Sequence, residues 1–189
     1  PNFRGAVYIH FLNADGTVKA TTRIGDGTNG GPSLVNFEYF GSTLANLGDI
    51  DGDGVTDLAV GANGFGGGGL NRGAVYILRL NTDGTVKSGG ITKIAEGLNG
   101  GPTLANFAFF GSAVANLGDL DGDGVTDLAV GAALESTEGT SRGAVYILRL
   151  NADGSVKTGG TTRIASGVNG GPTLTDRSNF GSSVASLGD

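Results

Sequence analysis

Two short acidic segments carry the side chains that are most capable of chemistry. The first, DIDGDGVTD at residues 49–57, places carboxylates at its positions 1, 3, 5 and 9, and the second, at residues 119–127, repeats this spacing. The eight carboxylates are Asp49, Asp51, Asp53, Asp57, Asp119, Asp121, Asp123 and Asp127. Like charges placed so closely repel one another unless a cation neutralises them. The glycines between them let each segment curl, so that alternate carboxylates can face one centre.

The type of ligand in these segments predicts which cation they bind. The backbone carbonyls of Val55 and Val125, at position 7, would add a further oxygen to each set. An all-oxygen set suits Ca²⁺ better than Mg²⁺, which keeps its waters and demands a strict octahedron. Zn²⁺ would need nearby His or Cys. We therefore predict two calcium sites; the alternative is a pair of solvated acidic turns without metal.

The acidic segments resemble an EF-hand loop only in part. An EF-hand needs a bidentate Glu at position 12, where this chain has Val60 and Val130. Both valines stand in apolar runs that are typical of strands rather than helices. We therefore expect the acidic loops to join β-strands.

An internal repeat of 70 residues organises the chain. Near-identical segments start at Phe40, Phe110 and Phe180, and RGAVYI occurs at Arg4, Arg72 and Arg142. Self-similarity at a fixed period is the sequence signature of a repeat architecture. The predicted units are residues 1–39 (the second half of a repeat), 40–109 and 110–179 (full repeats), and 180–189 (the start of another).

Each full repeat predicts four short strands. In the first, these are residues 42–47, 56–62, 72–80 and 91–95, and Asp83-Gly84 between two apolar runs is a strong hairpin signal. No segment has sustained helical periodicity. The chain is thus predicted to be all-β, made of four-stranded antiparallel β-propeller blades of about 70 residues each. A parallel β-helix is the alternative, but its repeat would be much shorter.

Composition excludes several classes of protein. Glycine accounts for 38 of 189 residues without the three-residue period of collagen, and cysteine is absent, so disulfides and thiolate chemistry are excluded. No apolar window is long enough to span a membrane. With 18 acidic and 12 basic residues, the net charge of −6 argues against non-specific binding to nucleic acid.

Taken together, Phe-Gly at the start of each repeat, the aspartate loop and Gly-Ala at 61–62 and 131–132 resemble the FG-GAP repeat. This repeat forms the blades of the integrin α-subunit propeller and of bacterial surface and secreted proteins. The resemblance implies calcium bound by the eight aspartates and by the carbonyls of Val55 and Val125. It also implies an extracellular or cell-surface module for adhesion, recognition or surface architecture, whose ligand is an extracellular protein or a glycan. The near-identical repeats and the lack of cysteine suggest a bacterial source.

The chain is too short for a closed ring, because two full repeats and two partial ones supply fewer than three complete blades. Open blades expose unpaired strand edges. The remaining blades should therefore come from a longer chain or from other copies of this one. In the second case the chain is a self-assembling subunit of a ring or filament.

Outside the acidic loops, little in the sequence indicates catalysis. The only histidine, His10, is expected to be a surface residue of a strand, and Asp15, Asp83 and Asp153 fit turn geometry. Arg72 and Arg142 are expected to form structural ion pairs with a neighbouring loop. The recurrent Tyr8, Tyr76 and Tyr146 are expected to pack in the core, and the glycine run 66–69 reads as a flexible connector. A propeller enzyme acting on polysaccharide is the weaker alternative, so the chain is predicted not to be an enzyme.

Overall fold

The computed structural model describes residues 2–66 and 70–188, so most of the glycine run 66–69 lies outside the described residues. The described residues form three antiparallel sheets, and none of them belongs to a helix that could cross a membrane. The strands are β1 (Ala6–Leu12), β2 (Val18–Gly25), β3 (Thr43–Gly48), β4 (Asp57–Ala62), β5 (Ala74–Leu80), β6 (Val86–Ile94), β7 (Phe110–Gly118), β8 (Asp127–Ala132), β9 (Ala144–Leu150) and β10 (Val156–Ala165).

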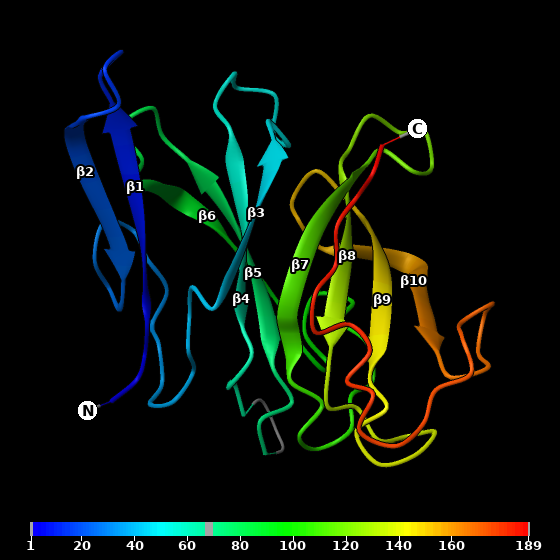
Figure 1. The fold of residues 1–189 in the computed structure, drawn as a ribbon. Coiled ribbons are helices and arrows are strands. Elements are labelled where there is room, and N and C mark those ends of the chain that lie inside the picture. Colours follow the sequence, from blue (N-terminus) through cyan, green and yellow to red (C-terminus); the bar gives the residue numbers. More distant parts are fainter. Residues whose placement is uncertain (1, 67–69, 189) are drawn as a thin grey trace.

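The sheets follow the order of the chain. Strands β3–β6 form one four-stranded sheet and β7–β10 a second, each with its strands in sequence order, while β1 and β2 form a two-stranded sheet. Figure 1 shows the three sheets side by side, with β3–β6 between the other two. We call them the N-terminal half-blade (β1–β2), the middle blade (β3–β6) and the C-terminal blade (β7–β10). These are blades of a partial β-propeller, as the sequence predicted.

The hairpin turns owe their shape to aspartate and glycine. In the turn from β5 to β6, Asp83 Oδ1 accepts hydrogen bonds from the amide and the hydroxyl of Thr85, at 2.9 and 2.7 Å, and Gly84 takes a φ of 76°. These bonds lower the pKa of the Asp83 carboxyl. Asp15 and Asp153 make the same bonds in the other hairpins, which confirms their predicted role in turns.

The fourth strand of the middle blade is longer than the sequence predicted. We expected it over residues 91–95, but β6 begins at Val86, because Val86 pairs with Leu80 before the register shifts and resumes at Ile91. The shift is a bulge around Gly89, whose φ is 68°. A bulge lets a strand continue past residues that do not pair. The first three predicted strands are correct to within two residues at each end.

The main apolar core lies between the middle and C-terminal blades. It joins Leu47, Ile50 and Ile77 from the former with Phe110 and Leu128 from the latter, all of which are buried. A second core joins the N-terminal half-blade to the middle blade. The blades are therefore held face to face by apolar side chains, and each acidic loop is fixed at the end of a packed sheet.

Candidate metal centre

The two acidic loops connect the first and second strands of their blades, and Asp49 organises the first loop. Its Oδ1 accepts the amides of Gly52 and Asp53 at 2.7 and 3.0 Å, and its Oδ2 accepts the amide of Gly54 at 2.6 Å. Asp119 makes the equivalent bonds in the second loop at 2.7, 3.0 and 2.7 Å. The first aspartate thus curls the chain around its own carboxylate.

The last aspartate of each loop holds the loop against the strands of its blade. Asp57 is fully buried at the start of β4, where its two oxygens accept the amides of Ile50 and Leu80 at 3.1 and 2.9 Å. Burial raises the pKa of the Asp57 carboxyl, although the two amide hydrogen bonds oppose the rise. Asp127 is buried in the same way between the amides of Leu120 and Leu150.

Three of the four predicted carboxylates in each loop converge. Oxygen atoms of Asp49, Asp51 and Asp57 lie within 4.8 Å of one another, as do those of Asp119, Asp121 and Asp127. The remaining two predicted ligands lie next to each other at the loop's side, where Asp53 Oδ1 accepts the amide of Val55 at 2.8 Å. Asp123 and Val125 repeat this contact at 3.0 Å. The donor set is composed of oxygens, which fits a hard cation such as Ca²⁺.

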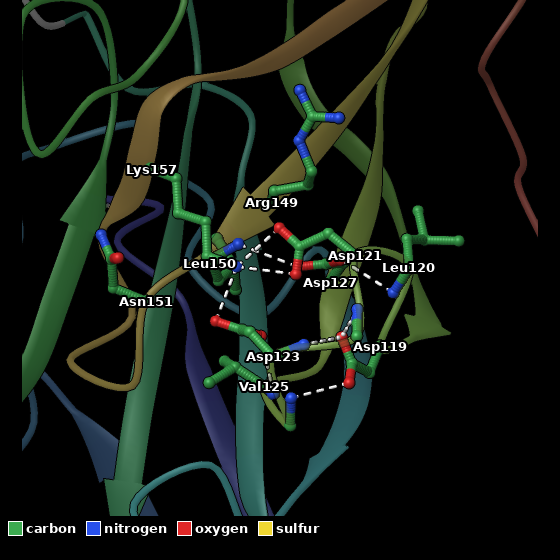
Figure 2. Close-up of polar contacts among 12 residues, drawn as sticks. Asp119, Leu120, Asp121, Asp123, Val125, Asp127, Arg149, Leu150, Asn151 and Lys157 are labelled. Atoms are coloured by element: carbon green, nitrogen blue, oxygen red, sulfur yellow. Dashed lines mark hydrogen bonds and ion pairs between the residues drawn. The ribbon is translucent and has the colours of Figure 1, made fainter.

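A lysine that the sequence analysis did not single out also enters each site. Lys87 Nζ lies 2.5 Å from Asp51 Oδ2 and 2.5 Å from Asp53 Oδ2. In the second site, Lys157 contacts Asp121 and Asp123, and Figure 2 shows it reaching the loop from β10, the fourth strand of the same blade. The hydrogen bond from Lys87 is the main reason that the pKa of Asp53 is lowered. The recurrence of the lysine in both repeats is the signal that could have found it.

A second polar cluster in the middle blade was also missed. Glu38 is fully buried and accepts hydrogen bonds from the Tyr76 hydroxyl, from Lys93 Nζ at 2.9 Å and from the Val35 amide at 2.7 Å. Lys93 also lies 3.2 Å above the centre of the Phe65 ring. Tyr76 is buried, as predicted, and burial together with Glu38 raises the pKa of its hydroxyl.

The C-terminal blade builds the same cluster from different positions. Its buried carboxylate is Glu135, which accepts the Tyr146 hydroxyl at 2.6 Å and Arg163 Nη2 at 2.6 Å. Glu135 aligns with Phe65 of the previous repeat, whereas the position that aligns with Glu38 holds Ala108. The acidic residues therefore do not recur in the sequence, but their carboxylates recur in space.

The remaining predicted residues lie outside the acidic loops. Arg72 pairs with Glu96, and Arg142 Nε lies 2.9 Å from Asp176 Oδ1, which confirms their structural ion pairs. His10 is exposed on β1, where its Nδ1 lies 2.9 Å from the Thr21 hydroxyl oxygen, as expected of a surface residue. Tyr8, which we expected in the core, is 56 % exposed, because no sheet of the described chain covers the outer face of β1.

Comparison with known proteins gives consistent matches. The model of the FG-GAP repeat matches residues 40–78 and 110–148. Human integrin alpha-11 is 40 % identical over 110 residues, which cover 58 % of this chain and 8 % of the integrin. Chicken (Gallus gallus) integrin alpha-V is 39 % identical over 123 residues, which cover 61 % of this chain and 10 % of that integrin. Integrin alpha-PS2 of Drosophila melanogaster is 39 % identical over 115 residues, or 58 % of this chain and 8 % of the integrin. The matched region thus spans about a tenth or less of the length of these relatives.

Proposed function

Because this chain contains two FG-GAP repeats and is similar to integrin α-subunits, we propose that it is part of an extracellular β-propeller that binds calcium. The module would serve adhesion, recognition or surface architecture, with an extracellular protein or a glycan as its ligand. The whole integrins are far longer than this chain, so the partner itself is not specified by the resemblance.

The observation that carries this proposal is the duplication of the acidic loop. Both copies bring three carboxylates within 4.8 Å of one another, and both bury the last of the three at the start of a strand. In both, a lysine ammonium already lies among the carboxylates, so the loop accommodates positive charge at this point. The proposed ligands are the eight aspartates with the carbonyls of Val55 and Val125.

Bound calcium would supply a doubly charged centre that neutralises the carboxylates of each loop. The residues around it determine what this does to the fold. Asp49 holds the loop's backbone amides, and Asp57, the first residue of β4, ties Ile50 of the loop to Leu80 at the end of β5. A cation that links these two aspartates would therefore lock the turn between the first two strands of the blade. A metal that binds only the folded loop adds stability in proportion to RT ln(1 + [Ca²⁺]/Kd).

Thermal unfolding with and without calcium tests the proposal. We expect a chelator such as EGTA to lower the Tm of the chain, and millimolar calcium to restore it. Asp51→Ala and Asp121→Ala should each remove part of this response, because each removes one ligand from one loop. An unchanged Tm in chelator would contradict calcium binding.

A second variant separates metal binding from the general architecture of the loop. Asp57→Asn places an amide where two backbone N–H groups now donate to two carboxylate oxygens. Asp57→Asn should lower the free energy of unfolding by about 1–3 kcal/mol in chelator as well as in calcium, because a buried N–H donor loses its acceptor. In chelator, Asp51→Ala should lower stability less than Asp57→Asn does, because Lys87 loses one carboxylate but keeps its contact with Asp53; its larger effect should appear in calcium. If the two variants behaved alike in chelator, the assigned division of roles would be wrong.

The exposed edge of β1 supports a second candidate function, a self-assembling structural subunit. In the middle blade, β5 pairs with both β4 and β6, whereas its counterpart β1 pairs only with β2 among the described residues. An open strand edge is a template for pairing with another chain. Light scattering in millimolar calcium tests this candidate: a discrete oligomer would support it, and a folded, soluble monomer would contradict it.

We propose no catalytic role for this chain, and a bacterial source stays a prediction. The division of the chain into residues 1–39, 40–109, 110–179 and 180–189 also stays a prediction. In the described structure, β3–β6 and β7–β10 fall within the second and third of these units. Cleavage of polysaccharide by the purified chain would contradict the non-enzymatic assignment.

A further inference from the structure

The lysine in each acidic loop stands where a metal would have to compete with it. Lys87 Nζ lies 2.5 Å from an oxygen of Asp51 and 2.5 Å from an oxygen of Asp53. Lys157 lies 2.8 and 2.6 Å from the two oxygens of Asp121 and 2.6 Å from Asp123. In both copies, the ammonium thus engages the carboxylates at positions 3 and 5 of the loop, and Figure 2 shows the copy with Lys157.

The backbone positions this lysine in the same way in both blades. Lys87 follows Val86, which is buried and pairs with Leu80, and Leu80 donates its amide to Asp57 at the base of the loop. Successive side chains of a strand point to opposite faces, so Lys87 is directed away from the core that Val86 enters. The Val86 amide is in turn held by the Asn29 carbonyl at 3.0 Å. Val156 repeats the pairing with Leu150 and the bond to Asn99.

The contacts are those of a partly enclosed ion pair. The Lys87 and Lys157 side chains are each 22 % exposed, and the Asp51 and Asp121 side chains are 20 % and 28 % exposed. Such pairs are screened less by solvent and salt than fully exposed ones. The ammonium supplies one positive charge to a loop whose carboxylates otherwise repel one another.

We propose that Lys87 and Lys157 are tethered cations that occupy the acidic loops when metal is absent and must move aside when it binds. The proposal rests on calcium binding by these loops. An ammonium and a divalent cation held by the same carboxylates repel each other strongly at a few ångströms. Each lysine therefore weakens the loop's affinity for metal and keeps the metal-free loop folded.

Replacement of both lysines by methionine tests this role. Methionine keeps an unbranched apolar stem of similar length and removes the ammonium, with its charge and its hydrogen-bond donors. The matched control is Lys19→Met, because Lys19 holds the same place after the β1–β2 turn in a half-blade whose described residues include no acidic loop. The probe is calcium chloride, titrated into each 189-residue protein in a calorimeter, with unfolding in EGTA as a second measurement.

We expect the Lys87→Met/Lys157→Met protein to bind calcium roughly three- to tenfold more tightly than wild type, the range in which a moderate competing ion pair shifts an apparent Kd. In EGTA its Tm should fall below that of wild type, and saturating calcium should narrow the difference. Lys19→Met should match wild type in both measurements.

Three outcomes would overturn the proposal. Unchanged affinity in the double variant would show that the lysines do not compete, and weaker binding would show that they support the metal. In both cases the wild-type isotherm would still establish calcium binding. If neither wild type nor the double variant bound calcium, the proposed function and the role of the lysines would fail together.

Discussion

At the scale of single residues, the buried carboxylate beneath the tyrosine of the third strand is the clearest link between chemistry and packing. Glu38, in the segment before β3, and Glu135, in the segment after β8, both accept the tyrosine hydroxyl and a cationic side chain. A buried carboxylate is tolerated only when such partners replace water. The two blades therefore meet the same requirement from different sequence positions.

The prediction at this scale moves the buried carboxylate from one sequence position to another. Glu38→Ala should lower the free energy of unfolding by about 3–5 kcal/mol, because it leaves Tyr76 and Lys93 without their buried acceptor. Adding Phe65→Glu places the carboxylate where Glu135 stands in the next repeat, and it should recover a substantial part of the loss. Urea unfolding of the two variants measures both effects. If the second substitution lowered stability further, the two clusters would not be equivalent.

At the scale of elements, the repeated glycines mark where neighbouring blades touch. A Cβ on Gly61 of β4 would overlap the carbonyl oxygen of Gly111, which begins the next blade, and a Cβ on Gly111 would overlap the carbonyl oxygen of Ala74. Phe110, beside Gly111, packs edge-on against Tyr146 with ring centres 5.6 Å apart. The Phe-Gly and Gly-Ala pairs of the repeat thus let backbones approach while the phenylalanine fills the core.

Alanine at Gly111 gives the element-scale prediction. Gly111 has a φ of 86° and no room for a side chain, so Gly111→Ala combines backbone strain with overlap. The control is Gly159→Ala, at a φ of 68° with no atom within 4 Å of the added Cβ. The control should lose about 1–2 kcal/mol from the left-handed conformation alone. Gly111→Ala should lose roughly 1–3 kcal/mol more, measured by denaturant unfolding. Equal losses would mean that the contact between blades can relax.

At the scale of the whole molecule, equivalent residues differ in burial according to whether a following blade covers them. Ile50, at position 2 of the first acidic loop, is 6 % exposed and belongs to the core between the middle and C-terminal blades. Its counterpart Leu120 in the last blade is 53 % exposed. At the other end of the molecule the preceding element decides: Tyr76 packs in the core shared with the N-terminal half-blade, whereas no described sheet precedes that of Tyr8.

This contrast predicts that the same substitution has different effects at the two positions. Ile50→Ala should lower the free energy of unfolding by about 2–5 kcal/mol, because it opens a cavity between two blades. Leu120→Ala should change stability by about 0.5 kcal/mol or less, as expected at an exposed position. Both values come from thermal or urea unfolding at low protein concentration. A large loss at Leu120 would reveal that this face is covered in solution by another chain.

The sequence by itself determined the repeat, the all-β fold and the acidic loops. It could do so because strand periodicity, Asp-Gly turns and closely spaced carboxylates are local patterns whose chemistry follows from neighbouring residues. The first three strands of the middle blade were predictable for that reason. The start of β6 was not, because the bulge that follows Val86 depends on its pairing with Leu80.

Tertiary structure alone decided which distant side chains meet. Lys87 reaches Asp51 across 36 residues of chain, and Glu38 reaches Tyr76 across 38. No local pattern records such contacts, since they depend on how strands pair and how one blade packs on the next. The same packing decides burial: similar repeats place Tyr76 in the core and Tyr8 at the surface. A repeat sequence specifies each blade, but the neighbours of that blade set the environment of its residues.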